Sequence, residues 1–230
     1  MLDAHQVHMI MFWIRRLQMG NERMVKKVYN ECKSLADNHN QKNWVWEIKS
    51  ILAKCGLHSW WHQSSCDGFS HGEAKHVVTC CLFRLERENW KSDIVSKPKL
   101  RSYVKLKADY GETEGYVQRI RVKAHRSLLA RLRGGTAPLQ IETGRYVCLP
   151  VEERTCKTCN SGMVEDEEHF CVGCPGLKET RGPLLRLMEQ AQPGFGLLQD
   201  EEKFIRIMLH ANADSRVGKL LYSMFLDRTS

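Results

Sequence analysis

The chain is organised around one segment, which reads Cys156-Lys-Thr-Cys159-Asn-Ser-Gly162-Met-Val-Glu165-Asp-Glu-Glu168-His169-Phe-Cys171-Val-Gly173-Cys174-Pro175. In the opening C-x2-C motif, a tight turn can present the thiols of Cys156 and Cys159 to one metal ion. Gly162 follows and can adopt the positive φ that such a turn often requires. His169 and Cys174 can complete a tetrahedral arrangement. The segment therefore predicts a Cys3His metal site.

The acidic run at 165–168 predicts the first turn of a short helix, where the helix dipole favours negative charge. His169 would lie at the far end of that turn. On a continuous helix His169 and Cys174 would point about 140° apart. We therefore expect the helix to stop between them, and Gly173 and Pro175 can supply that stop.

Four protein ligands predict a structural zinc ion, because a catalytic zinc keeps one position open for water. The metal would provide most of the local folding free energy, by analogy with about 10–16 kcal/mol in zinc-finger peptides. Cys171 is a competing ligand, ranked below Cys174 because it follows His169 too closely. The alternative is a group of four unrelated, reduced residues.

Length and composition indicate an intracellular globular protein. The 230 residues can bury a sizeable core, and the formal net charge of +8 favours an anionic partner. The apolar run at 7–14 is short and is followed by Arg15 and Arg16, which reverses the charge order of a signal peptide. The ten cysteines therefore predict reduced thiols in the nucleus or cytoplasm. No apolar run approaches the about eighteen residues that span a bilayer, so no membrane partner is expected.

Residues 1–95 are predicted to form a helical region. Helices are expected at 9–17, after a cap at Asn21, from a cap near Asn43 to Gly56, and from about Glu73 toward Trp90. The stripes expected to face a core are Met9, Phe12, Trp13 and Leu17; Met24, Val25, Val28 and Cys32; Trp44, Ile48, Ile51 and Leu52; and Val77, Cys81 and Leu85. The side chains that could stack on bases, but are interpreted first as packing, are Trp44, Trp46, Trp60 and Trp61.

A weaker metal pattern lies in the same region. Cys55, His58, His62 and Cys66 recur every three or four positions, so the last three would share one helical face. No C-x2-C turn anchors them, which makes a second zinc the less favoured interpretation. The following stretch, 65–72, is expected to be a loop.

Residues 96–150 are predicted to form a basic helical connector, which begins at the break Ser96-Lys-Pro98. Between Lys97 and Arg133 there are eleven Lys or Arg residues and three acidic ones, an excess equal to that of the whole chain. One helix is expected over 114–133, ended by Gly134-Gly135. Its apolar stripe would be Ile120, Ala124, Leu128 and Leu132. The residues expected to contact nucleic-acid phosphates are Arg119, Lys123, Arg126 and Arg133 on this helix, with Lys97, Lys99 and Arg101 before it. The alternative is a solvated basic face.

Residues 151–230 are predicted to combine the metal module with a covering set of helices. Pro183 fits the first turn of one helix, Asp200 can cap a second, and Asp214 can precede a third. No β-rich region is apparent. The fold class is therefore expected to be mainly α.

Several motifs together resemble a known family. They are Lys97-Pro-Lys-Leu-Arg101, Glu112-Thr-Glu-Gly-Tyr-Val117, Leu132-Arg-Gly-Gly-Thr-Ala-Pro-Leu139, Ile141-Glu-Thr-Gly-Arg145, the segment 156–174 and Asp200-Glu-Glu-Lys-Phe204. From about His8 to Arg228 the chain resembles the C-terminal region of non-LTR retrotransposon reverse transcriptases, of the jockey-like LINE type. Cys156, Cys159, His169 and Cys174 match the positions of that family's CCHC zinc ligands.

The resemblance implies a region downstream of the polymerase domain that grips element RNA or target DNA during target-primed reverse transcription. The rest of the element polyprotein would be a partner. Polymerase chemistry needs an Asp-Asp pair for its metal ions, and this sequence contains none. We therefore expect no enzymatic activity from the chain alone.

Three functions follow from these observations. The first is a zinc-stabilised module that binds nucleic acid, with RNA or an RNA–DNA hybrid favoured and DNA as an alternative. The second is a zinc-braced protein-interaction module, in which case the chain itself would be a domesticated or degenerate fragment of an element. The third is a residual enzyme, which no nucleophile motif or carboxylate pair supports.

Overall fold

The computed structural model describes residues 4–63, 70–107 and 109–229, and these residues form a mainly α fold, as predicted. Within those ranges the only strand pairing is an isolated bridge between Thr155 and Val164. None of the described helices has the length and apolar character needed to cross a lipid bilayer. The chain divides into two compact units, residues 1–90 and 91–230.

The division differs from the predicted organisation in one respect. The first boundary was expected at residue 95 and lies close by, inside the helix α5 (His71–Ser96). The second was expected at residue 150. However, 96–150 and 151–230 contribute to one continuous core, so the connector and the metal module belong to a single unit.

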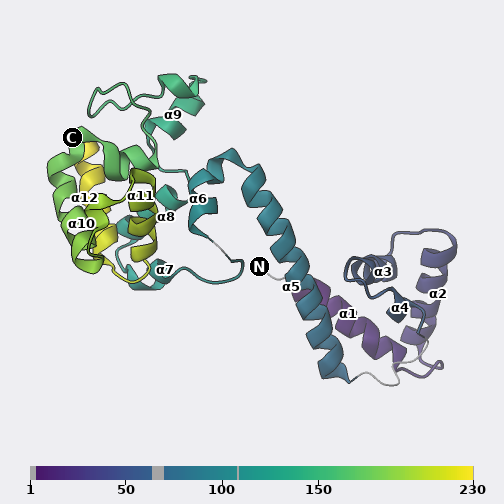
Figure 1. The fold of residues 1–230 in the computed structure, drawn as a ribbon. Coiled ribbons are helices and arrows are strands. Elements are labelled where there is room, and N and C mark those ends of the chain that lie inside the picture. Colours follow the sequence, from purple (N-terminus) through teal and green to yellow (C-terminus); the bar gives the residue numbers. More distant parts are fainter. Residues whose placement is uncertain (1–3, 64–69, 108, 230) are drawn as a thin grey trace. The chain divides into compact units, whose positions relative to one another are not determined.

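The first unit packs four helices and the beginning of α5 around one core (Figure 1). The four are α1 (Ala4–Leu17), α2 (Met24–Asn38), α3 (Trp44–Lys54) and α4 (His58–Trp61). At its centre the indole N–H of Trp13 donates to the hydroxyl of Tyr29 at 3.0 Å. Trp60 and Trp61 are buried, which agrees with packing rather than base stacking.

Helices α1, α2, α3 and α5 were predicted, whereas α4 was not. Trp13, Leu17, Ile48, Ile51 and Leu52 are buried as expected, but other residues assigned to the core are not. Phe12, Val77 and the α2 residues Met24, Val25 and Val28 are exposed. The buried side chains lie at neighbouring positions on the same helices: Ile10 and Ile14, Tyr29 and Ala36, and Ala74, Val78 and Leu82. On a helix, shifting an apolar stripe by one residue rotates it by about 100°. On these helices the sequence is compatible with burial of either the predicted stripe or the neighbouring one, and tertiary packing selects the neighbouring one.

Two helices of this unit, α3 and α5, begin with side-chain caps. The Oδ1 atom of Asn43 accepts from the backbone N–H groups of Val45 and Trp46, both at 3.0 Å, which confirms the predicted cap. Asn21 is not a cap, because α2 begins after Arg23. Helix α5 begins with a reciprocal pair of hydrogen bonds between Ser70 and Glu73, a capping box that the sequence interpretation missed.

Replacing Asn43 by Ala should lower the free energy of unfolding of the first unit by about 1 kcal/mol. All six tryptophans of the chain lie within residues 1–90, so tryptophan fluorescence during urea unfolding reports on this unit. Asn21→Ala is the matched control and should change little, since Asn21 is exposed. Equal effects of the two substitutions would contradict the capping role of Asn43.

The second unit packs its helices around the core that also holds the metal segment. Helix α8 (Lys123–Arg133) packs against α12 (Arg216–Thr229), and α12 packs against α10 (Lys178–Ala191). Helix α11 (Asp200–His210) contacts α6 (Arg101–Leu106) and the turn η3 (His169–Gly173). Figure 1 shows α8, α10, α11 and α12 side by side. The remaining elements are η1 (Pro98–Leu100), α7 (Gly115–Arg119), α9 (Gln140–Tyr146), η2 (Val151–Glu153), η4 (Pro175–Leu177) and η5 (Phe195–Leu197).

The single helix expected over 114–133 is two helices, α7 and α8, separated by extended backbone at Ile120. Ile120 is buried against Gly218 of α12, where an added Cβ would lie 2.6 Å from the Ile120 Cδ1 atom. The guanidinium of Arg126 donates to the Ile120 carbonyl at 2.8 Å and so replaces a helical hydrogen bond. Ala124, expected in the apolar stripe, is exposed.

The C-terminal helices agree with the sequence in position but not in every detail. Pro183 lies inside α10, which begins five residues earlier at Lys178, so its expected place in the first turn was wrong. Asp200 is the first residue of α11 rather than its cap. Asp214 does precede α12, and its carboxylate accepts from the backbone N–H of Arg216 at 2.8 Å.

Candidate metal centre

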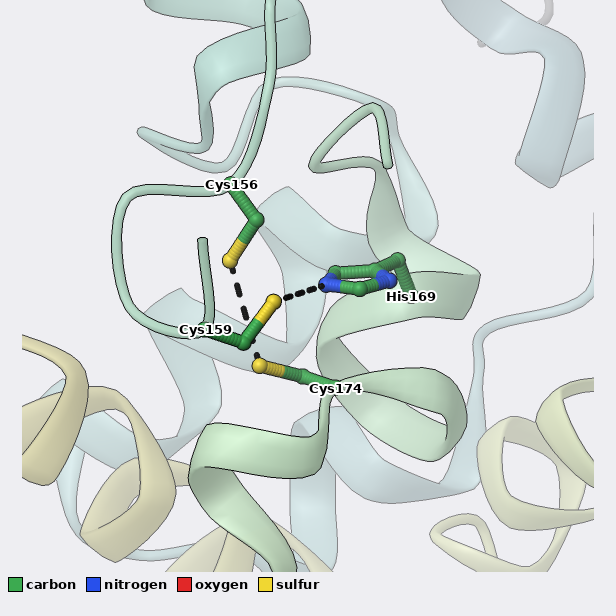
Figure 2. Close-up of side chains that lie close together, drawn as sticks. All are labelled: Cys156, Cys159, His169 and Cys174. Carbon is green, nitrogen blue, oxygen red and sulfur yellow. Dashed lines mark hydrogen bonds between the residues drawn. The ribbon is translucent and has the colours of Figure 1, made fainter. Parts of the chain in front are cut away.

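Cys156, Cys159, His169 and Cys174 form one cluster that can hold a metal ion (Figure 2). One candidate ligand atom from each residue lies within 4.8 Å of the others. The Sγ atoms of Cys156 and Cys174 are 3.8 Å apart, and the Sγ of Cys159 lies 3.4 Å from Nε2 of His169. Separations of this size are those of ligands that surround one tetrahedral ion at bond lengths of about 2.0–2.3 Å.

A short hairpin positions the first two ligands. The bridge between Thr155 and Val164 pairs its arms, and the N–H of Cys156 donates to the carbonyl of Met163 at 2.8 Å. The chain reverses through positive φ values at Asn160 (50°) and Gly162 (74°). The predicted role of Gly162 is confirmed, because this backbone conformation favours glycine.

A widened helical turn positions the other two ligands. The segment 169–173 is π-helical, and the N–H of Cys174 donates to the carbonyl of His169 at 2.6 Å. An i→i+5 hydrogen bond stacks Cys174 one turn after His169, whereas an α-helix would direct the two side chains apart. The helix does end before Cys174, as predicted. However, the end of the helix alone does not bring His169 and Cys174 together, because the wide π-helical turn is also needed. The Asp166 side chain accepts from the N–H of His169 at 2.8 Å at the start of this turn.

A buried ion pair joins the hairpin to the last helix. Arg228 of α12 donates through Nε and Nη2 to the two carboxylate oxygens of Glu165, at 2.6 and 2.7 Å. Glu165 is buried and also accepts from the N–H of Gln140 at 2.8 Å. Hydrogen bonding to Glu165 raises the pKa of the Arg228 guanidinium. This contact connects residues 63 positions apart, and the sequence interpretation did not identify it.

A second buried carboxylate supports the helical turn. Glu167 accepts from Nη2 of Arg101 at 2.8 and 2.7 Å. Burial, opposed by Arg101, raises the pKa of Glu167. Arg101 was expected to contact nucleic acid, but its guanidinium is already engaged with Glu167, two residues before η3.

The thiols of the cluster differ in their acidity. Burial, together with the neighbouring Cys156 thiol, raises the pKa of Cys174 to about 12, and burial also raises the pKa of Cys156. Burial acts to raise the pKa of Cys159 too, but hydrogen bonds from Ser161 and contacts with Cys156 and His169 lower it to about 6. A divalent cation would favour the thiolate form of all three, since thiolates are the metal-binding species.

Cys171, the competing ligand, is outside the cluster. Its side chain is fully buried in the core of the second unit, and burial raises its pKa well above the usual value. The preference for Cys174 therefore agrees with the structure. Cys171 is a core residue.

The second predicted metal site finds no support in the part of the chain that the structure describes. His58 and His62 are exposed on and beside α4, and Cys55 is buried in the first core. Cys66 lies outside the described residues. Among the described residues, the Cys3His cluster is the one group of three or more ligands found.

The predicted nucleic-acid contacts divide into free and engaged side chains. Arg133 is 2% exposed, donates to Glu114 at 2.8 Å and to the carbonyl of Met208 at 2.7 Å, and is therefore unavailable. Lys97 pairs with Asp93, and Lys99 with Glu142.

Arg119 and Lys123 are exposed and have no ion pair with a described residue. Arg121 lies between them and is also exposed, without an ion pair to a described residue. The sequence did not single it out as a nucleic-acid contact.

Comparisons with known proteins found no matching family model, and no significant match among curated proteins or solved structures.

Proposed function

We propose that the chain is a zinc-stabilised nucleic-acid-binding module, of the kind found in the C-terminal region of non-LTR retrotransposon reverse transcriptases, without catalytic activity of its own. The observation that supports the metal is the convergence of three thiols and one imidazole within 4.8 Å. Such a soft donor set favours zinc over Mg2+ or Ca2+, which prefer oxygen ligands. Four protein ligands leave no position for a catalytic water, so the zinc would be structural.

The support for nucleic-acid binding is a surface that we name the basic turn, consisting of Arg119, Arg121 and Lys123. These side chains are exposed around the junction of α7 and α8, and no described acidic residue forms an ion pair with them. Unpaired cations grouped at one helix junction attract phosphate and gain affinity by releasing its counterions. RNA or an RNA–DNA hybrid is the proposed ligand, with duplex DNA as the alternative.

Three phosphate contacts set the expected salt dependence. The logarithm of the association constant should fall with the logarithm of salt concentration with a slope of about −2 for single strands and about −3 for a duplex. Filter binding of RNA, hybrid and DNA over a salt series measures this slope. Replacing all three residues of the basic turn by Gln should abolish most of the salt dependence of binding. Each lost phosphate contact should reduce the slope by roughly one unit.

The matched control removes the same charge from side chains that already have acidic partners. It is the triple variant Lys105→Gln, Arg206→Gln and Arg216→Gln, whose partners are Glu201, Glu202 and Asp214. This variant should bind with nearly the parent slope. An equal loss of slope in both triple variants would show that total charge, and not the basic turn, determines binding. No binding of nucleic acid at low salt would refute the proposal.

A protein partner is the second candidate function, favoured by exposed apolar side chains close to the metal hairpin in sequence. Tyr146, Val147 and Val151 are exposed to 73%, 68% and 48%. Exposed apolar groups in close succession are typical of interaction surfaces. Affinity capture with and without nuclease separates the two candidates, because a partner bridged by RNA is lost on digestion and a directly bound protein remains.

A further inference from the structure

A cavity of about 360 Å³ lies beside α10, η5 and the beginning of α11. Its apolar wall consists of Val172, Leu185 and Phe195. Its charged side chains are Arg181, Arg186, Glu189, Asp200 and Lys203. None of the four metal ligands lines it, although Arg181 interacts electrostatically with the Cys174 thiol. Its volume is typical of cavities that bind small molecules.

Arg181 is the unusual residue of this cavity. Its side chain is only 7% exposed, and its Nε and Nη1 atoms have no hydrogen-bond partner among the described residues. Buried guanidinium groups nearly always have anionic or carbonyl partners, because an unpaired buried charge is costly. The guanidinium of Arg181 therefore lacks a hydrogen-bond acceptor, and a bound ligand could supply one.

The acidic residues of the cavity already have other partners. Both carboxylate oxygens of Glu189 accept backbone N–H groups, from Gly194 at 2.7 Å and Gly196 at 2.8 Å. The carboxylate of Asp200 accepts from Lys203 at 3.3 Å. Arg181 and the exposed Arg186 remain as the cations without a described acidic partner.

We propose that this cavity binds a small ligand in which one phosphate or carboxylate group is attached to a short apolar portion. The Arg181 guanidinium would donate charge-assisted hydrogen bonds to the oxyanion. The apolar portion would contact Leu185 and Phe195. Glu189 and Asp200 disfavour a polyanion, which distinguishes this cavity from the basic turn.

Calorimetric titration of the full, metal-bound chain with phenyl phosphate, benzoate and inorganic phosphate tests the proposal. One of the two aromatic probes should bind more tightly than inorganic phosphate, and the tighter of them identifies the anionic group. Arg181→Met should weaken that binding about tenfold or more, because it removes charged hydrogen bonds. Arg131→Met, which removes an exposed Arg of α8, is the control and should leave the affinity unchanged.

Leu185→Trp is a second test that keeps the charge and fills the cavity, and it should also weaken binding of the aromatic probe about tenfold or more. Failure of all three probes to bind at millimolar concentration would overturn the proposal. Undiminished binding by Arg181→Met or Leu185→Trp would do the same. Loss of metal from Arg181→Met with unchanged probe affinity would assign Arg181 to support of the metal centre instead.

Discussion

Removal of the metal by a strong chelator is expected to unfold the metal hairpin and loosen the helices packed on it, while residues 1–90 stay folded. Two of the four ligands lie on a hairpin whose arms share a single bridge, and the metal would link this hairpin to His169 and Cys174. In zinc-finger peptides the metal contributes about 10–16 kcal/mol to folding. The first unit has its own core and none of the ligands.

Hydrogen exchange and fluorescence together measure this outcome. Amides of residues 151–230 should exchange rapidly after chelation, whereas tryptophan fluorescence should not change, because every tryptophan lies in the first unit. Added zinc should restore the slow exchange. A Cys156→Ser, Cys174→Ser variant is the control, since chelator should have no further effect on it. Unchanged exchange in the parent chain would contradict a structural metal.

Replacement of Arg228 by Met is expected to destabilise the second unit by about 3–5 kcal/mol, because it leaves the carboxylate of Glu165 buried without its cation. The urea midpoint of the metal-bound chain, followed by circular dichroism, measures the change. Arg216→Met is the matched control on the same helix. Its ion pair with Asp214 is on the surface, so its loss should change the midpoint little.

A double variant tests the reason for the effect. In Glu165→Gln combined with Arg228→Met, no charge remains buried, so the loss should be smaller than for Arg228→Met alone. If the double variant loses as much free energy of unfolding as the two single variants together, the ion pair is not the cause of the effect.

The metal ligands could be predicted because their geometry is local. Cys156 and Cys159 are presented by one hairpin, and His169 and Cys174 by one helical turn. Cysteine and histidine spacing therefore carries most of the information. The π-helical turn itself could not be predicted, since it depends on one hydrogen bond between Cys174 and His169 that competes with the usual helical pattern.

The errors concern contacts between distant parts of the chain. Helical periodicity placed Arg133 on an exposed basic face, but it donates to the carbonyl of Met208, 75 positions away. The break at Ile120 depends on Gly218 of α12, which sequence near the break does not reveal. The pairing of Glu165 with Arg228 is equally remote. Local patterns predicted the helices and the ligands, whereas burial and pairing depend on the tertiary fold.

Native mass spectrometry of the full chain, combined with elemental analysis, tests the metal centre most directly. The account predicts one zinc ion per chain in the parent and none after Cys156, Cys159, His169 and Cys174 are all replaced. A metal-free parent chain, or zinc retained after all four replacements, would contradict it.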